Sequence, residues 1–141
     1  MAIAPTSRQL TALAERAPDG KLYMLNLLKF KERAEYADGR DSDLTGAEAY
    51  ARYAEGVGAI IRELGGRGIW TGHTNVQVIG DGDVAWDMVA IVEYPSLQAF
   101  RDMTASEAYQ DVHVHREAGL DHQLLINCLS ADQARALAGS S

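Results

Sequence analysis

The pattern of hydrophobic and polar positions divides the chain into alternating helical and extended segments. Apolar residues recur at helical spacing over residues 6–17, which predicts a short leading helix. A nearly continuous apolar run over 22–30 is too short for a core helix and predicts a strand buried on both faces. Thr45 and Glu48 form a capping-box signature, and the helical spacing behind them continues to the glycine pair 65–66.

The second half of the chain predicts a hairpin followed by helices. Residues 68–79 alternate with period two, residues 80–83 form a glycine- and aspartate-rich turn, and residues 84–94 return as an apolar strand. Ser96 is the predicted N-cap of the next helix, and a further helix or helical turn begins near Ser106. This half of the chain is therefore predicted to contain two consecutive strands and then one or two helices.

A last strand is predicted over 123–129, and an alanine-rich tail helix over 132–138. Between the two terminal helices the order of elements is βαββαβ, which predicts an α+β fold of the ferredoxin-like type with a four-stranded antiparallel sheet. We expect an N-terminal helical extension over 1–20, one ferredoxin-like domain over 21–129 and a C-terminal tail helix over 130–141.

Two of the predicted strands are apolar on both faces, although the helices of this fold cover only one face of the sheet. The second face therefore needs a partner. A homodimer in which two sheets pack into a dimeric α+β barrel is the simplest solution.

Composition and charge narrow the class of partner. The chain has 141 residues, of which 47% are hydrophobic and 23% charged, as in ordinary globular proteins. Its 13 basic residues are scattered among 20 acidic ones, for a net charge of -7, and this balance disfavours nucleic-acid binding.

Location and cofactors are constrained by what the chain lacks. No apolar stretch is long enough to span a membrane, and the first residues lack the apolar region of a signal peptide. The single cysteine, Cys128, fits a reducing compartment. We therefore expect a cytoplasmic protein. No phosphate-binding glycine motif or paired cysteine site occurs, so we expect no cofactor and no metal.

Four sequence motifs carry a resemblance to a known family. They read, in chain order, YMLNLLKF, TGAEAY, WDMVAIVEYPS and HVHREAGLDHQLLI. Over about residues 20–129 the chain resembles the family known as domain of unknown function 1330, in the dimeric α+β barrel superfamily. The resemblance implies a ferredoxin-like protomer, a dimer built sheet to sheet and a ligand-sized cavity between helices and sheet. It implies no particular reaction.

Three residues are candidates for acid–base catalysis. Asp87 follows Trp86 in an apolar strand, where desolvation would suit a general acid or base, although an ion pair or a solvated strand start explains it equally. His113 and His115 lie in a helical context that separates their rings, which argues against a shared metal. Either histidine, paired with Asp87, would form a proton-transfer dyad.

The remaining candidates would bind a substrate. Asn26 lies inside an apolar strand and must have hydrogen-bond partners, either a ligand or the protein itself. Arg116 would hold a carboxylate or form a structural ion pair. Tyr50, Trp70 and Trp86 would line an aromatic pocket or pack in the core and the dimer interface.

Two functional hypotheses follow. The first is a cofactor-independent enzyme that acts on a small organic molecule by proton transfer in a pocket between sheet and helices. The alternative is a non-catalytic homodimer that binds a small ligand or has a structural role. Convergence of the candidate side chains in one open pocket distinguishes the first from the second.

Overall fold

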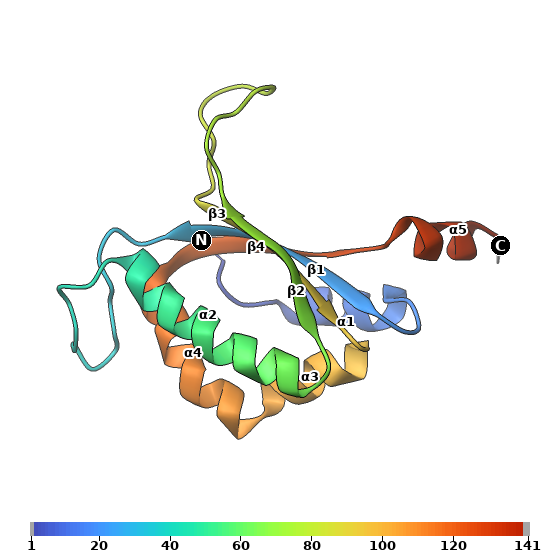
Figure 1. The fold of residues 1–141 in the computed structure, drawn as a ribbon, viewed down its shortest axis with the longest axis horizontal. Helices are drawn as coiled ribbons and strands as arrows, with labels where there is room; N and C mark the ends of the chain where they lie inside the picture. The colour runs from blue at the N-terminus through green and yellow to red at the C-terminus, as the bar shows by residue number, and fades with distance from the viewer. Residues whose placement is uncertain (1, 140–141) are drawn as a thin grey trace.

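The computed structural model describes residues 2–139, which form five helices and four strands (Figure 1). In chain order the elements are α1 (Ser7–Arg16), β1 (Leu22–Phe30), α2 (Gly46–Glu63), β2 (Arg67–His73), β3 (Met88–Tyr94), α3 (Leu97–Ala105), α4 (Glu107–Gly119), β4 (Leu120–Cys128) and α5 (Ala131–Gly139). This order confirms the ferredoxin-like βαββαβ arrangement with an extra helix at each end, and its second helical segment is divided into α3 and α4.

The four strands form one antiparallel sheet in the order β2-β3-β1-β4. The helices α2, α3 and α4 lie together on one side of it (Figure 1). β1 is an inner strand, with β3 on one edge and β4 on the other. Both edges of β1 are therefore paired, whereas helices cover only one of its two apolar faces.

The helix-covered face of the sheet holds the core. Leu22, Met24 and Leu28 of β1 are buried there, and Leu28 pairs in register with Met88 and Gln123. Helices contribute buried aromatic and aliphatic side chains to the same cluster, namely Tyr50, Tyr53, Val57, Ile61, Met103 and Tyr109. Burial of this apolar area supplies the main stabilisation of the fold.

Local signals in the sequence set the helix boundaries. The hydroxyls of Thr6 and Thr45 each accept a hydrogen bond from the backbone N–H three residues on. In return, the backbone N–H of each threonine donates to the side-chain oxygen of that same residue, Gln9 or Glu48. Ser96 and Ser106 cap α3 and α4 by the same hydroxyl contact. The helix starts predicted from these residues are confirmed.

Two glycines allow α2 and α4 to approach closely. A β-carbon on Gly119 would lie 2.2 Å from the carbonyl oxygen of Gly46, and one on Gly46 would lie 2.1 Å from the carbonyl oxygen of Lys31. The backbone N–H of Lys31 donates to the Gly119 carbonyl at 2.8 Å. The start of α2, the end of α4 and the loop after β1 are therefore joined backbone to backbone.

The predicted hairpin is longer than the observed one. We predicted strands over 68–79 and 84–94, but β2 ends at His73 and β3 begins at Met88. Residues 74–87, which we call the β2–β3 arm, project away from the sheet on the side opposite the helices (Figure 1). Apolar and polar residues alternate along the arm as they do in a strand. The arm nevertheless extends past the sheet, and the paired β-ladder of β2 and β3 ends at its base.

The second face of the sheet is apolar, and no helix formed by residues 2–139 covers it (Figure 1). It includes Leu25 and Leu27 of β1, Val89 and Ile91 of β3, Ile69 and Trp70 of β2, and Leu124 and Ile126 of β4. We call it the open face. Trp70 is 56% exposed.

Within the described residues, no helix has both the length and the apolar character needed to cross a membrane.

Candidate functional site

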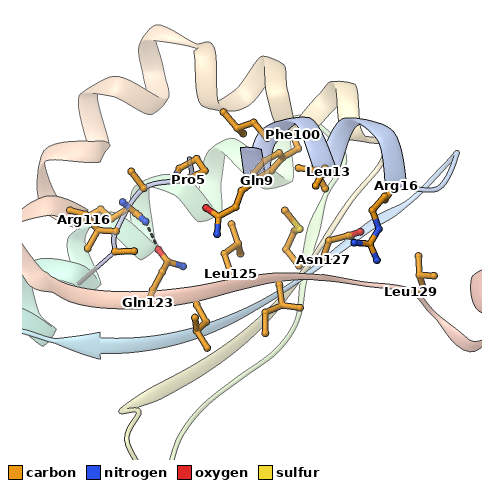
Figure 2. Close-up of a pocket in the computed structure, with 18 residues that line it drawn as sticks. Pro5, Gln9, Leu13, Arg16, Phe100, Arg116, Gln123, Leu125, Asn127 and Leu129 are labelled. Carbon is orange, nitrogen blue, oxygen red and sulfur yellow. Dashed lines mark hydrogen bonds between the residues drawn. The ribbon is translucent and has the colours of Figure 1, made fainter. Parts of the chain in front are cut away.

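A cavity of about 510 Å³ lies between the N-terminal segment with α1 and strand β4 (Figure 2). Its apolar lining includes Leu10 and Leu13 of α1, Phe100 of α3 and Leu125 of β4. Small-molecule sites typically enclose about 300–1,000 Å³ and combine apolar walls with a few polar groups. We call this cavity the α1 pocket, and it is the candidate functional site.

One end of the α1 pocket is polar. The guanidinium of Arg116 donates a hydrogen bond to Oε1 of Gln123, and both side chains line the pocket (Figure 2). The Nε2 of Gln123 donates to Oδ1 of Asn26 at 3.3 Å, and Nδ2 of Asn26 donates to the carbonyl of Ala90 at 3.2 Å. Asn26 thus has hydrogen-bond partners within the protein. Its contact with Gln123 holds that side chain in place at the pocket.

The charge of Arg116 is not neutralised by a carboxylate. Within residues 2–139 it forms no ion pair with Asp or Glu, and its hydrogen-bond partner is the neutral amide of Gln123. A guanidinium at the end of an apolar cavity attracts an anion more strongly than it would in open water. The polar end of the pocket is therefore suited to a carboxylate or similar group.

The other end of the α1 pocket carries a second arginine. Arg16, in the last turn of α1, lines the pocket on the side of Asn127 and Leu129 (Figure 2). In the described part of the chain it has neither an ion pair nor a hydrogen-bond partner on its side chain. Asn127 donates to the carbonyl of Tyr23 at 3.1 Å. The pocket is thus apolar in the middle and has a cation at each end.

α1 also supplies a polar group to the pocket. Gln9 lines it, and the Oε1 of Gln9 is held by the backbone N–H of Thr6 at 2.9 Å in the capping box. The amide group points toward Leu125 in Figure 2. The hydrogen bond that caps the helix therefore also fixes a donor, the side-chain NH₂, over the pocket.

Asp87 lies away from the α1 pocket, at the end of β1. Its carboxylate accepts a hydrogen bond from the backbone N–H of Phe30 at 2.9 Å and pairs with Nζ of Lys29 at 3.2 Å. In the part of the chain that the structure describes, no hydrogen bond or ion pair joins it to His113 or His115. The structure therefore joins Asp87 to neither of these two histidines in a proton-transfer dyad.

The two histidines of α4 have different surroundings. His113 pairs through Nδ1 with Glu117 at 2.7 Å and contacts the ring of Tyr109. His115 lies with Nδ1 at 2.6 Å from the hydroxyl of Tyr36, which also accepts a hydrogen bond from Arg52 at 3.3 Å. Neither histidine lines the α1 pocket.

Titration of His115 offers a first prediction. Partial burial lowers the pKa of His115 below its usual 6.5, and the charges of Arg52 and Arg40 act in the same direction against a weaker opposing effect of Asp41. The unfolded chain thus takes up a proton at this residue at a higher pH than the folded protein. We expect stability to fall as pH drops from the unfolded pKa toward the folded one.

NMR titration of the imidazole checks this directly, and a pKa at or above 6.5 would contradict it. The variant His115→Asn is the control for the stability effect. Denaturation curves at several pH values should show that the variant loses part of the pH dependence below the unfolded pKa. Equal pH dependence in both proteins would show that His115 does not contribute.

The three aromatic candidates occupy three different environments. Tyr50 packs in the core against Phe30 and Tyr53, and burial raises its pKa to about 12, opposed by the charge of Arg116. Trp70 lies on the open face. Trp86 belongs to the β2–β3 arm, and its ring contacts His122 at 5.2 Å. None of the three lines the α1 pocket.

Sequence reasoning missed four polar residues of the pocket, Gln9, Arg16, Gln123 and Asn127. The first two belong to the segment that we treated as an extension outside the domain. Gln123 interrupts an apolar strand in the same manner as Asn26, and this was the available signal. The two amides lie 97 positions apart in sequence but are hydrogen-bonded.

Solved structures of known proteins resemble this chain. The crystal structure of a protein of unknown function from Rhodopseudomonas palustris matches with a TM-score of 0.79 and 36% identity, covering 89% of this chain and 94% of that one. The methylated form of that protein matches with a TM-score of 0.80 and 36% identity, covering 92% and 96% of the two chains.

More distant structures share the fold alone. A dimeric ferredoxin-like protein of unknown function from Jannaschia sp. CCS1 matches with a TM-score of 0.51 and 13% identity, over 79% of this chain and 100% of that one. A dimeric protein of unknown function with a ferredoxin-like fold from Bacteroides fragilis matches with a TM-score of 0.50 and 9% identity, over 78% and 96%.

No protein with a curated description matches the chain. A family model does match, over residues 39–127, and its description is "Domain of unknown function (DUF1330)". The matched region begins in the loop after β1 and ends within β4, so it includes most of the sheet and the helices that cover it. The motifs in the sequence predicted this result, and the chain belongs to the DUF1330 family.

Proposed function

We propose that this protein binds a small, largely apolar organic anion in the α1 pocket. The observation that carries the proposal is the position of Arg116, a guanidinium with no carboxylate partner among residues 2–139, at the end of an apolar cavity of about 510 Å³. Gln123 and Asn26 orient this guanidinium through a chain of hydrogen bonds. The apolar walls would take up the hydrocarbon part of the ligand.

The chemistry of the pocket favours a carboxylate over a neutral polar group. An arginine recognises a carboxylate through parallel N–H donors, and hydrogen bonds to charged groups contribute more than neutral ones. Arg16 at the other end adds a second positive charge. A hydrocarbon or aromatic acid fits this distribution of charge better than an alcohol, an amine or a sugar.

Decanoate and decanol are suitable probes because they share the hydrocarbon chain and differ in charge. We expect isothermal titration calorimetry to detect decanoate binding and Arg116→Gln to weaken it by about tenfold or more, since a charged hydrogen bond contributes about 1.5–3 kcal/mol. Decanol should bind equally to both proteins. Arg8→Gln, on the exposed side of α1 and outside the pocket, is the matched control.

Two results would overturn the proposal. One is that neither decanoate nor decanol binds to the unchanged protein. The other is that Arg116→Gln weakens the binding of decanoate and of decanol equally. The second result would show that the arginine supports the shape of the site without recognising charge. Thermal melts of each variant verify that the fold is retained.

We also propose that two copies of the chain form a homodimer through their open faces. The dimeric ferredoxin-like relatives have the same fold. Large contiguous apolar surfaces mark interfaces in soluble proteins. The charged groups at the borders of this face are already paired, Asp87 with Lys29 and Glu93 with Arg67 at 3.2 Å each. A second copy would thus bury the face without leaving these charges unpaired.

The enzyme hypothesis is the second candidate function, and one contact favours it. The 2.6 Å separation between the Tyr36 hydroxyl and Nδ1 of His115 joins two groups capable of proton transfer, next to Arg52. This pair is not part of the α1 pocket, and Asp87 and His113 have other partners. Ligand binding is therefore the function that the geometry supports best.

A further inference from the structure

Hydrogen bonds within the β2–β3 arm fix the conformation of its base and of its tip. At the base, the backbone N–H of Thr74 donates to the carbonyl of Asp87 at 3.1 Å, and the hydroxyl of Thr74 donates to the carbonyl of Trp86. At the tip, Nε2 of Gln77 donates to the carbonyls of Asp81 and Gly82 at 2.9 and 3.1 Å. These contacts hold the arm in a defined shape.

The middle of the arm presents apolar side chains that the chain itself does not cover. Val76, Val78 and Ile79 are 70%, 85% and 91% exposed. They are the most exposed large hydrophobic residues among positions 2–139. These three β-branched residues lie within four positions of one another on a projecting segment, and none of them belongs to the core clusters of the described residues.

The place from which the arm projects indicates what covers it. The arm leaves the sheet from β2 and β3, directly beyond the apolar side chains of the open face, and it extends to the side opposite the helices (Figure 1). A body packed on the open face would therefore lie alongside the arm. The apolar residues of the arm thus lie in the segment that connects two strands of the face that the second copy covers in the proposed homodimer.

We propose that the β2–β3 arm of each subunit packs against the other subunit, where Val76, Val78 and Ile79 become buried. This inference rests on the proposed homodimer. In a two-fold dimer the contact occurs twice, because the same patch of each subunit meets the same surface of its partner. The arms thus extend the interface beyond the sheets and hold the two subunits together from outside.

The first test measures the dimer dissociation constant by sedimentation equilibrium. The triple variant Val76→Ser, Val78→Ser, Ile79→Ser should raise it by about tenfold or more relative to the unchanged protein. Val114→Ser is the matched control, since Val114 is 41% exposed on α4, away from the arm and the open face. An unchanged dissociation constant in the triple variant would contradict the inference.

The second test measures burial of the arm. Val78→Cys in a Cys128→Ser background leaves one thiol, and its alkylation rate by a maleimide reports exposure. We expect slow alkylation in the dimer and fast alkylation when Trp70→Glu and Ile91→Glu are added to separate the subunits. Equal rates would overturn the arm contact. If the unchanged protein is a monomer, the homodimer itself fails, whereas a dimer with a freely alkylated arm refutes the arm contact alone.

Discussion

Replacing Gly119 with alanine is expected to destabilise the protein by about 3 kcal/mol, measured by chemical denaturation. The added β-carbon would lie 2.2 Å from the carbonyl oxygen of Gly46 and 2.8 Å from the backbone nitrogen of Tyr50. Both are backbone atoms and cannot rotate away as a side chain does. The helices α2 and α4 would have to separate, which disturbs the core between them.

The expected loss of stability is opposite in sign to the usual effect of replacing a helical glycine with alanine. Alanine stabilises a helix relative to glycine when nothing obstructs it, by about 1 kcal/mol. Gly68→Ala is the control, because its β-carbon would have no neighbour within 4 Å, and its effect should stay within about 0.5 kcal/mol. A Gly119→Ala variant as stable as the unchanged protein would show that α2 and α4 do not approach this closely.

Introducing charge on the open face is expected to convert the proposed dimer into monomers. Trp70 and Ile91 are paired in register on neighbouring strands, and neither lines the α1 pocket. The double variant Trp70→Glu, Ile91→Glu would place carboxylates between the two sheets, where an unpaired charge is strongly disfavoured. The dimer dissociation constant should increase by a factor of about a hundred or more.

Sedimentation velocity over a wide range of protein concentration checks this result. Val114→Glu is the control, because it adds a glutamate at an exposed apolar position outside the open face, one negative charge against two in the double variant. The control should remain dimeric and the double variant monomeric, with similar circular dichroism spectra. A double variant that stays dimeric would place the subunit contact elsewhere on the molecule.

Much of the fold is predictable from the sequence because buried apolar positions recur with the period of the helix or strand that contains them. β1 matches its predicted bounds, since its continuous apolar sequence has clear ends and the strand is paired along both edges. The capping box of Thr45 and Glu48 predicts where α2 begins because its hydrogen bonds are local. The resemblance to the DUF1330 family also proved correct.

In the β2–β3 arm, the periodic pattern predicts longer strands than the structure contains. Its alternating residues Val76 and Val78 resemble a strand, but periodicity cannot tell whether a neighbouring strand is present to complete the ladder. The same alternation arises when a segment is covered by another molecule. The error in the predicted strand ends is therefore itself consistent with a partner on this segment.

The candidate site was only partly predictable. Asn26 and Arg116 were selected for their chemistry, and both prove to be joined through Gln123 at the α1 pocket. Asp87 was selected for its neighbour Trp86, but its carboxylate is held by Lys29 and the backbone of Phe30. Such pairings depend on which strands become neighbours, and local sequence patterns contain no information on that choice.

The order of strands in the sheet also has a consequence for synthesis of the chain. β1 lies beside β4, and the side chain of Asn127 bonds the carbonyl of Tyr23, 104 positions earlier. A ribosome therefore completes β1 long before it makes the strand that covers its second edge. During that interval an apolar, unpaired strand is exposed to other nascent chains. A chain that stops before β4 would keep this edge open permanently and would aggregate.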